Sequence, residues 1–326
     1  MAFLIGGANT LDDAYDISNS LRFDDSNYLT RDNTTQNGGG TNFTFSAWVK
    51  MSTYGHGGYQ GIFSIFKDSN DYFEIYKDNG NGDNAGSENL QICQNINGTN
   101  VCYQIQDHEF ADYSAWYHLV VNFNNSESNQ VDKVSIYVNG TEIAGAVTNS
   151  NPFADVGLGD SAYDTRVGAY RDNTSATWNG YMADVHLIAG QTLAASYFGK
   201  TNNNGVWVPK EYTGTFGDNG FFLEFKQTGT SQNSSGMGAD TSGEDNHLAV
   251  TGLSSIDVTV DTPTNNFCTM NPIAADPHTT LAEGNLKWTS GGNGGVVGTM
   301  AVSNGKWYWE CKGVDVGADS QLGIWQ

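Results

Sequence analysis

The sequence predicts an all-β protein, built as an antiparallel β-sandwich. Two observations lead to this class. Hydrophobic and polar residues alternate in short segments almost everywhere, and turn residues interrupt the pattern about every ten residues. The 326 residues include 40 Gly but only 5 Pro, and they are 38% hydrophobic and 15% charged. Such a composition is typical of a folded chain with a core, and not of a disordered tail or a coiled coil.

The clearest strand segments are short runs of β-branched and aromatic residues bounded by Gly, Asn, Asp or Ser. They are Phe43–Val49, Tyr72–Tyr76, His118–Phe123 and Val134–Val138. One segment, Leu193–Tyr197, has the pattern of a helical turn. The sequence therefore predicts strands with very little helix.

Three Asn-Gly pairs predict tight hairpins, because both residues tolerate the positive φ of a type I′ turn. A turn at Asn139–Gly140 would place Ile136 opposite Ile143, so one face of that hairpin would be apolar. A turn at Asn304–Gly305 would join two short strands, the second ending at Trp309.

The third pair, Asn97–Gly98, would place Cys93 directly opposite Cys102. In such a non-hydrogen-bonded pair the Cα atoms lie about 4.5 Å apart, which a disulfide can bridge. Two reduced thiols facing each other are the alternative, and a disulfide would then form only when the protein meets an oxidising medium. No pairing is predicted for Cys268 and Cys311, and the absence of paired Cys-x-x-Cys motifs speaks against zinc.

The charge of the chain excludes two classes of partner. Lys and Arg number 14 against 36 Asp and Glu, for a formal net charge of −22. So large an excess of negative charge argues against nucleic acid and anionic membranes as partners. No run approaches the roughly 20 apolar residues of a membrane span. The first ten residues lack the basic start and long apolar stretch of a secretory signal, so none is expected.

Composition divides the chain into four parts. Residues 1–20 are expected to form a docking arm that adds a strand to a partner's sheet. Dense strand patterning covers 21–226, and Thr, Ser, Gly and Asp then dominate 227–263. That composition predicts a linker with one short strand, around Ile256–Val260. Strand patterning resumes over 264–326.

The order and spacing of six segments carry a first resemblance. The segments are Ser20–Leu29, Phe43–Val49, Trp116–Val121, Val134–Glu142, Val167–Tyr170 and Trp178–Val185. Together they resemble the laminin-G-like, concanavalin A-type jelly-roll family over about 200 residues. The resemblance implies that 21–226 fold as a jelly roll of lectin type.

The last segment carries a second resemblance. Asn285–Trp288, Gly305–Glu310 and Ser320–Trp325 are similar to the opening half of a SPRY domain. A SPRY sandwich has roughly twice this length, so the resemblance implies an incomplete second β-sandwich. Either the gene product continues beyond Gln326, which we favour, or a neighbouring chain completes the fold.

The combination of the two domains resembles proteins of marine tailed bacteriophages. Three connecting segments share in it, namely Tyr212–Phe225, Asp240–Asn246 and Asp261–Phe267. The resemblance implies a virion structural protein, assembled in the host cytoplasm, that serves as a fibre or decoration element. It would be a homo-oligomer that contacts other virion proteins through residues 1–20 and adheres to host glycans. A purely structural scaffold and, less favoured, a glycan hydrolase are the alternatives.

A hydrolase of this sandwich class would need two carboxylates about 5 to 5.5 Å apart in the retaining case. The carboxylates Asp68, Asp71 and Glu74 follow one another at three-residue spacing, which puts neighbours on opposite faces of a strand. Those within 107–112 have the pattern of a surface turn. The sequence therefore predicts a protein that is not an enzyme.

Calcium is the one cofactor for which the sequence offers ligands, because its sites use several loop oxygens from Asp, Asn and backbone carbonyls. The candidates are Asp78 and Asp83 in one loop and Asp160 and Asp164 in another. Solvated turns are the alternative for both loops. No other cofactor is predicted.

Glycan binding would need aromatic rings that stand beside Asn and Asp side chains on loops. The candidates are Tyr54, Tyr59, Tyr170, Asp172, Asn173 and Trp178. For Trp178 the alternative is a core position at the start of a strand. Trp48 and Trp116 lie within strand alternation and are predicted to belong to the core.

Overall fold

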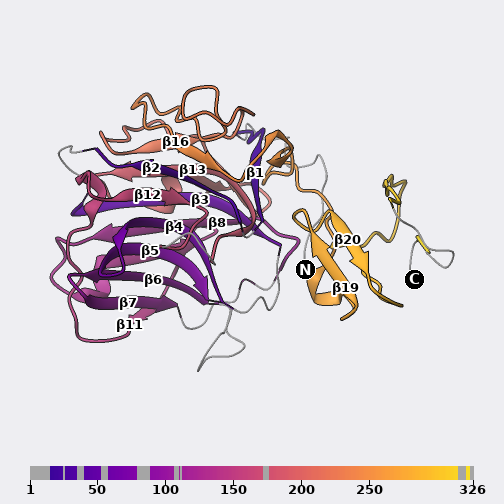
Figure 1. Cartoon of the computed structure of the whole chain (residues 1–326), viewed down its shortest axis with the longest axis horizontal. Helices are drawn as coiled ribbons and strands as arrows, with labels where there is room; N and C mark the ends of the chain where they lie inside the picture. The colour runs from indigo at the N-terminus through magenta and orange to yellow at the C-terminus, as the bar shows by residue number, and fades with distance from the viewer. Residues whose placement is uncertain are drawn as a thin grey trace.

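The structure is a computed structural model that describes residues 15–314 and 321–323, except 25, 35–39, 53–57, 79–88, 106–109, 111 and 172–175. Two large antiparallel sheets pack face to face, and a smaller hairpin lies beside them (Figure 1). The described residues contain strands and short 3-10 helices but no α-helix. None of them forms a helix long and apolar enough to span a membrane. The predicted all-β sandwich is confirmed.

The first sheet has the strand order β10-β9-β8-β3-β13-β1-β18, with β16 also paired to β13. We call it sheet A. Its strands are β1 (Ser20–Asp24), β3 (Asn42–Met51), β8 (Tyr117–Asn124), β9 (Val134–Val138), β10 (Thr141–Ile143), β13 (Asn179–Ala189), β16 (Phe221–Leu223) and β18 (Val258–Thr259).

The second sheet has the order β11-β7-β6-β5-β4-β12-β2-β17, and we call it sheet B. Its strands are β2 (Tyr28–Asp32), β4 (Tyr59–Asp68), β5 (Asp71–Asp78), β6 (Asn89–Ile96), β7 (Thr99–Ile105), β11 (Gly145–Val147), β12 (Asp164–Val167) and β17 (Ala249–Thr251).

Two small hairpins and five 3-10 helices complete the described elements. The hairpins pair β14 (Gly199–Thr201) with β15 (Trp207–Pro209), and β19 (Thr279–Ala282) with β20 (Lys287–Ser290). The 3-10 helices are η2 (Gln130–Lys133), η3 (Gly157–Gly159), η4 (Ala195–Tyr197), η5 (Ser255–Asp257) and η6 (Pro272–Ala274).

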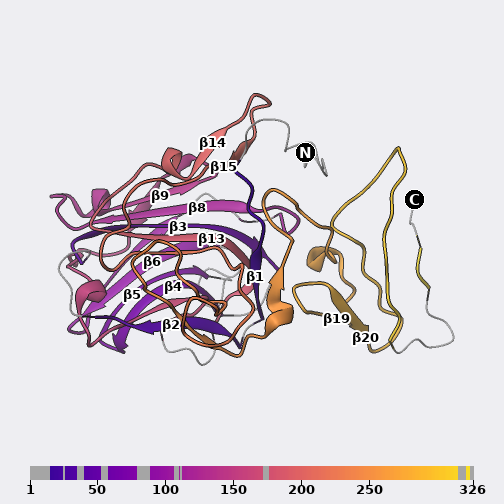
Figure 2. The same cartoon turned by 90° about the horizontal axis from the view of Figure 1, so that it is seen from above.

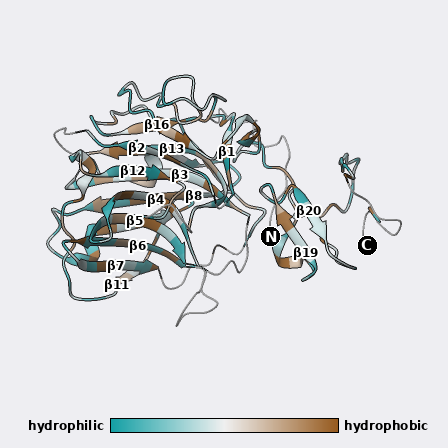
Figure 3. Cartoon of the chain, in the orientation of Figure 1, coloured by the Kyte–Doolittle hydropathy of each residue, from teal (hydrophilic) through white to brown (hydrophobic). Residues whose placement is uncertain are grey.

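The core lies between the two sheets, where apolar side chains of alternate residues meet. Phe43 of β3 lies 5.3 Å from Phe73 of β5 and 5.5 Å from Phe123 of β8, measured between ring centroids. Phe45 and Phe63 lie 4.8 Å apart. Colouring by hydropathy shows the hydrophobic residues interleaved with hydrophilic ones along the strands (Figure 3). This period of two is the pattern that predicted the fold.

Most predicted strands form, and one predicted strand is two strands in the structure. The four clearest segments lie within β3, β5, β8 and β9. Ile136 pairs with Ile143 across the Asn139–Gly140 turn, as predicted. The predicted opening strand 20–29 is instead two strands, because the chain turns after Asp24 and β1 joins sheet A while β2 joins sheet B. The turn at 193–197 contains the 3-10 helix η4.

The short strand predicted around Ile256–Val260 forms as β18, but the rest of 227–263 is more than the expected linker. Residues 227–263 supply β17 to the edge of sheet B, where it pairs with β2, and β18 to the edge of sheet A, where it pairs with β1. Met237 and Leu248 of this segment are buried in the main core cluster. A composition rich in Gly, Ser and Thr concealed this, because the segment packs by a few apolar residues between long polar turns.

The described part of the expected N-terminal arm packs on sheet A. Ile17 is buried beside Trp48, Trp116 and Tyr181. Tyr15 donates a hydrogen bond from its hydroxyl to Asp184 Oδ1 at 2.9 Å. Residues 15–20 thus belong to the sandwich, whereas 1–14 lie outside the described residues.

The C-terminal segment carries the β19–β20 hairpin, which lies to one side of the sandwich (Figure 2). The strands predicted on either side of Asn304–Gly305 do not form, and this prediction was wrong. Trp307 is 59% exposed and Tyr308 is 83% exposed. A strand needs a neighbour to accept its backbone hydrogen bonds, and the described chain pairs no strand with this segment.

Candidate functional site

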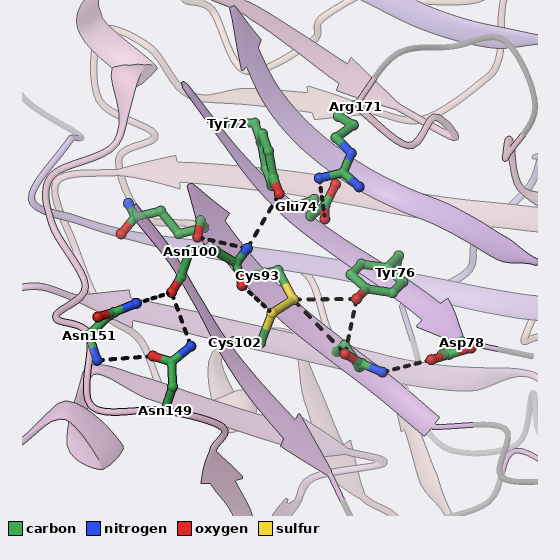
Figure 4. The surroundings of a disulfide bond; sticks show 12 residues. Tyr72, Glu74, Tyr76, Asp78, Cys93, Asn100, Cys102, Asn149, Asn151 and Arg171 are labelled. Carbon is green, nitrogen blue, oxygen red and sulfur yellow. Dashed lines mark hydrogen bonds and ion pairs between the residues drawn. A yellow bond between two sulfur atoms is a disulfide. The ribbon is translucent and has the colours of Figure 1, made fainter. Parts of the chain in front are cut away.

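The outward face of sheet B carries a polar and aromatic group centred on β5. Strand alternation turns Phe73 and Ile75 into the core and leaves Tyr72, Glu74 and Tyr76 on the opposite face. These three side chains are nevertheless buried, because neighbouring side chains cover them. Figure 4 shows them around a disulfide bond. We call this group the β5 face.

Three tyrosine rings meet at one end of the β5 face. Tyr59 stacks on Tyr170 with ring centroids 5.2 Å apart. Tyr76 meets both of them edge to face, at 5.1 Å from each. Tyr59 is 37% exposed, whereas Tyr76 and Tyr170 are buried. Solvent therefore meets this tyrosine cluster through the ring of Tyr59.

Arg171 continues the group toward the middle of β5. Its guanidinium lies over the ring of Tyr170 at 4.7 Å and over the ring of Tyr72 at 4.4 Å. Nη1 pairs with Glu74 Oε1 at 3.9 Å (Figure 4). Burial alone would lower the pKa of Arg171, but the negative charge of Glu74, with smaller effects of the tyrosines, raises it. The guanidinium stays charged and contacts two aromatic rings.

Amide side chains extend the β5 face on both sides. Tyr76 donates from its hydroxyl to Gln91 Oε1 at 2.9 Å, and Gln91 Nε2 donates to Asp78 Oδ2 at 2.9 Å. Asn100 Nδ2 donates to the Tyr72 hydroxyl at 3.3 Å. Burial, followed by the charge of Glu74, raises the pKa of Tyr76 well above its usual range. The phenol therefore keeps its proton and remains a donor at neutral pH.

A disulfide between Cys93 and Cys102 belongs to this face. The two residues are paired across the β6–β7 hairpin, and Asn97 at its turn has φ 51°. Cys93 Sγ lies 3.3 Å from the Tyr76 hydroxyl (Figure 4). The structure thus has the pairing that the Asn97–Gly98 turn predicted, and places it beside the candidate site.

Replacing both cysteines with serine is expected to lower the free energy of unfolding by about 2–3 kcal/mol, because the open chain regains the entropy of a short closed loop. Urea denaturation under non-reducing conditions would measure the change. Wild-type protein kept in a thiol reductant is the matched control and should lose a similar amount. An unchanged denaturation midpoint in the double variant would contradict the expectation.

The structure brings together only some of the residues predicted to bind glycan. Tyr59 and Tyr170 are in contact. Trp178 is 1% exposed and belongs to the main core cluster, so its assignment to a surface site is corrected: its ring packs between the sheets. The remaining candidates, Tyr54, Asp172 and Asn173, lie outside the described residues.

Sequence reasoning missed several residues of the β5 face. Tyr72, Glu74 and Tyr76 alternate on one strand, and this spacing is the signal that could have identified a shared outward face. Arg171 could not be placed there from the sequence, because it follows β12, which reaches β5 only through its pairing with β4.

The candidate calcium ligands that the structure describes bind groups of the protein itself. Asp160 Oδ1 accepts the backbone N–H of Ala162 at 2.9 Å. Asp164 pairs with Arg166 at 3.0 Å. Asp78 accepts from Gln91, and Asp83 lies outside the described residues. Within the described ranges no three His, Cys, Asp or Glu side chains gather as a metal site would require.

Among the residues that the structure describes, no second carboxylate lies opposite Glu74 on the neighbouring strands. The residues opposite Glu74 on the neighbouring strands are Ser64 and Cys93. Asp78 follows four residues later on the same strand, a separation of about 13 Å at about 3.3 Å per residue. Paired catalytic carboxylates lie within about 10 Å of each other in both mechanistic classes. Of the other predicted run, Asp112 is described, and Asp107 and Glu109 lie outside the described residues.

Comparison with solved structures finds proteins of similar fold. A Bacteroides ovatus protein described as carbohydrate binding has 14% identity and a TM-score of 0.44, covering 75% of this chain and 60% of that one. Tailspike protein 2 of the Escherichia coli O157:H7 bacteriophage CAB120 has 11% identity and a TM-score of 0.37, covering 53% and 23%. Domains LG4-5 of the mouse laminin α1 chain have 9% identity and a TM-score of 0.35, covering 70% and 54%.

The chain spans three fifths or less of each of these structures. A comparison with curated proteins finds no match. The sequence profile of one family matches residues 23–196, which is more than half of the chain and includes most strands of both sheets. The chain therefore belongs to the concanavalin A-like lectin/glucanases superfamily.

Proposed function

We propose that the sandwich binds carbohydrate on the β5 face, through the ring of Tyr59 and the guanidinium of Arg171. The contact that carries the proposal is the stacking of a partly exposed tyrosine, Tyr59, on the buried ring of Tyr170. Tyr76 supports both rings at their edges. The exposed ring is therefore fixed before a ligand arrives, which lowers the entropy lost on binding.

The chemistry of the β5 face suits a sugar. A pyranose has apolar C–H faces that pack on an aromatic ring and hydroxyls that need donors and acceptors at their edges. Next to the tyrosine cluster, the guanidinium of Arg171 supplies donors, and the Gln91 and Asn100 amides supply both kinds of group. The neutral phenol of Tyr76 keeps the amide of Gln91 in place.

We further propose that binding proceeds without hydrolysis. The support is the environment of Glu74, whose cross-strand neighbours are Ser64 and Cys93 rather than a second carboxylate. The protein would hold its ligand and leave it intact.

The biological setting we propose is a virion, in which the protein is a fibre or decoration element that adheres to host glycans. The support is the combination of domains in the sequence, which resembles proteins of tailed bacteriophages. Many weak sites on a homo-oligomer would act together by avidity. A cryo-EM map of the particle tests this setting: copies with the β5 face buried against neighbours would favour a scaffold role instead.

Tyr59→Ala is expected to weaken glycan binding about tenfold or more, because an aromatic contact at the centre of a site contributes on the order of 1–2 kcal/mol. The first measurement is a glycan array with the oligomeric protein, followed by calorimetric titration of the best ligand. Tyr197→Ala is the matched control, since Tyr197 is 50% exposed but belongs to η4 on sheet A. Binding that survives Tyr59→Ala and falls with Tyr197→Ala would move the site to the other sheet.

A further inference from the structure

We infer that the β5 face selects uncharged sugars, and that Glu74 sets this selectivity by occupying the guanidinium of Arg171. The inference rests on the proposed function and adds the class of ligand. An arginine at the edge of a sugar site would ordinarily favour ligands that carry a carboxylate or sulfate. Here the protein supplies the carboxylate itself, 3.9 Å from Nη1.

The geometry leaves Arg171 little freedom to exchange partners. Its guanidinium lies over the rings of both Tyr170 and Tyr72. The side chain of Arg166 donates through Nη1 to the backbone carbonyl of Arg171, which holds the main chain at this point. Arg166 is in turn paired with Asp164. A guanidinium fixed in this way can offer its remaining N–H groups to a sugar hydroxyl but cannot turn away from Glu74.

Burial makes the pairing with Glu74 hard to displace. The side chain of Glu74 is 2% exposed and that of Arg171 is 30% exposed. The carboxylate therefore lies deeper in the protein than the guanidinium. For a ligand approaching from solvent, the positive charge of Arg171 is already balanced by Glu74. A carboxylate on the ligand would gain little attraction from Arg171, because Glu74 already balances its charge. It would also be repelled by Glu74 at short range. The net charge of −22 on the whole chain acts in the same direction.

The experiment compares Glu74→Gln with the unmodified protein on an array that prints neutral glycans beside glycans bearing uronic or sialic acids. The unmodified protein is expected to bind neutral members only. Glu74→Gln keeps the size of the side chain and frees the charge of Arg171, so the ratio of acidic to neutral binding should rise at least about tenfold. The double variant Glu74→Gln/Arg171→Gln is the matched control and should show no such gain.

Each outcome separates the inference from the function beneath it. Equal binding of neutral and acidic members by the unmodified protein would overturn the inference and leave glycan binding intact. The same holds if Glu74→Gln, with a normal circular dichroism spectrum, gains no acidic ligand. If that variant does not fold, the inference is tested by the preference of the unmodified protein for neutral over acidic glycans. An array on which the unmodified protein binds nothing would remove the proposed function and the inference with it.

Discussion

Asp261→Ala is expected to lower the free energy of unfolding by about 3–5 kcal/mol, because it leaves a charge buried without its partner. Asp261 Oδ2 accepts from Lys50 Nζ at 2.8 Å, and the Lys50 side chain is fully buried. Asp261 Oδ1 accepts from Trp116 Nε1 at 3.0 Å. The substitution therefore removes the acceptor of an indole N–H and the anionic partner of an ammonium, which keeps only the neutral acceptors Asn266 Oδ1 and Phe267 O. Urea denaturation at neutral pH measures the loss.

The control for this prediction is Glu244→Ala, which removes an exposed carboxylate and should change stability by no more than about 0.5 kcal/mol. The pH dependence provides a second check. Burial lowers the pKa of Lys50, and Asp261 opposes that effect. Without Asp261 the folded protein releases the Lys50 proton more readily than the unfolded chain does, so stability should rise with pH toward about 10. A pH-independent loss would mean that Lys50 has found another anion.

Asp184→Asn is expected to stabilise the protein at pH 8 by a few kcal/mol and to have little effect near pH 4. Asp184 lies at a bulge of β13 with φ 53°, and its side chain is buried. Burial raises the pKa of its carboxyl from 3.8 to about 7, although the hydrogen bond from Tyr15 works against the shift. Asn keeps the shape, accepts the same hydrogen bond and tolerates positive φ, but it never ionises.

The direction of the pH dependence follows from which state, folded or unfolded, holds the proton on Asp184. Between about pH 4 and pH 7 the folded protein keeps a proton on Asp184 that the unfolded chain has lost. Stability therefore falls as pH rises through this window, by up to about 1.4 kcal/mol per pH unit, and levels off above it. Urea denaturation of both proteins at pH 4, 6 and 8 tests this. A difference between them that is the same at all three pH values would refute the raised pKa.

Local pattern predicted most strands and two of the three Asn-Gly hairpins, because their signals are local. The alternation over 72–76 and the Asn139–Gly140 turn can each be recognised from fewer than ten consecutive residues. The pairing of β18 with β1 joins residues more than 200 positions apart, such as Ser20 and Thr259. No local signal reports such a partner, so the polar segment that contains β18 looked like a linker.

The candidate site was only partly predictable for a related reason. Tyr59 and Tyr170 were identified as aromatic residues flanking loops, and they do meet. The contact of Arg171 with Glu74 depends on β4 lying between β12 and β5, which is a property of strand order and not of composition. Trp178 shows the reverse: it was a candidate for the surface site, with a core position as the alternative, and its ring lies in the core.

Two segments from opposite ends of the described sandwich meet at one place. Ser20 at the start of β1 lies opposite Thr259 at the end of β18. Just outside this pair, the backbone N–H of Ile17 donates to Thr264 Oγ1 at 3.3 Å. In an antiparallel pair, opposite pulls on these two ends separate the strands one contact at a time. Under mechanical tension the contacts of Glu283 and Gly284 with Arg22 and Tyr181 therefore take the load before this junction does. Both sheets, with the β5 face, lie beside the line of force.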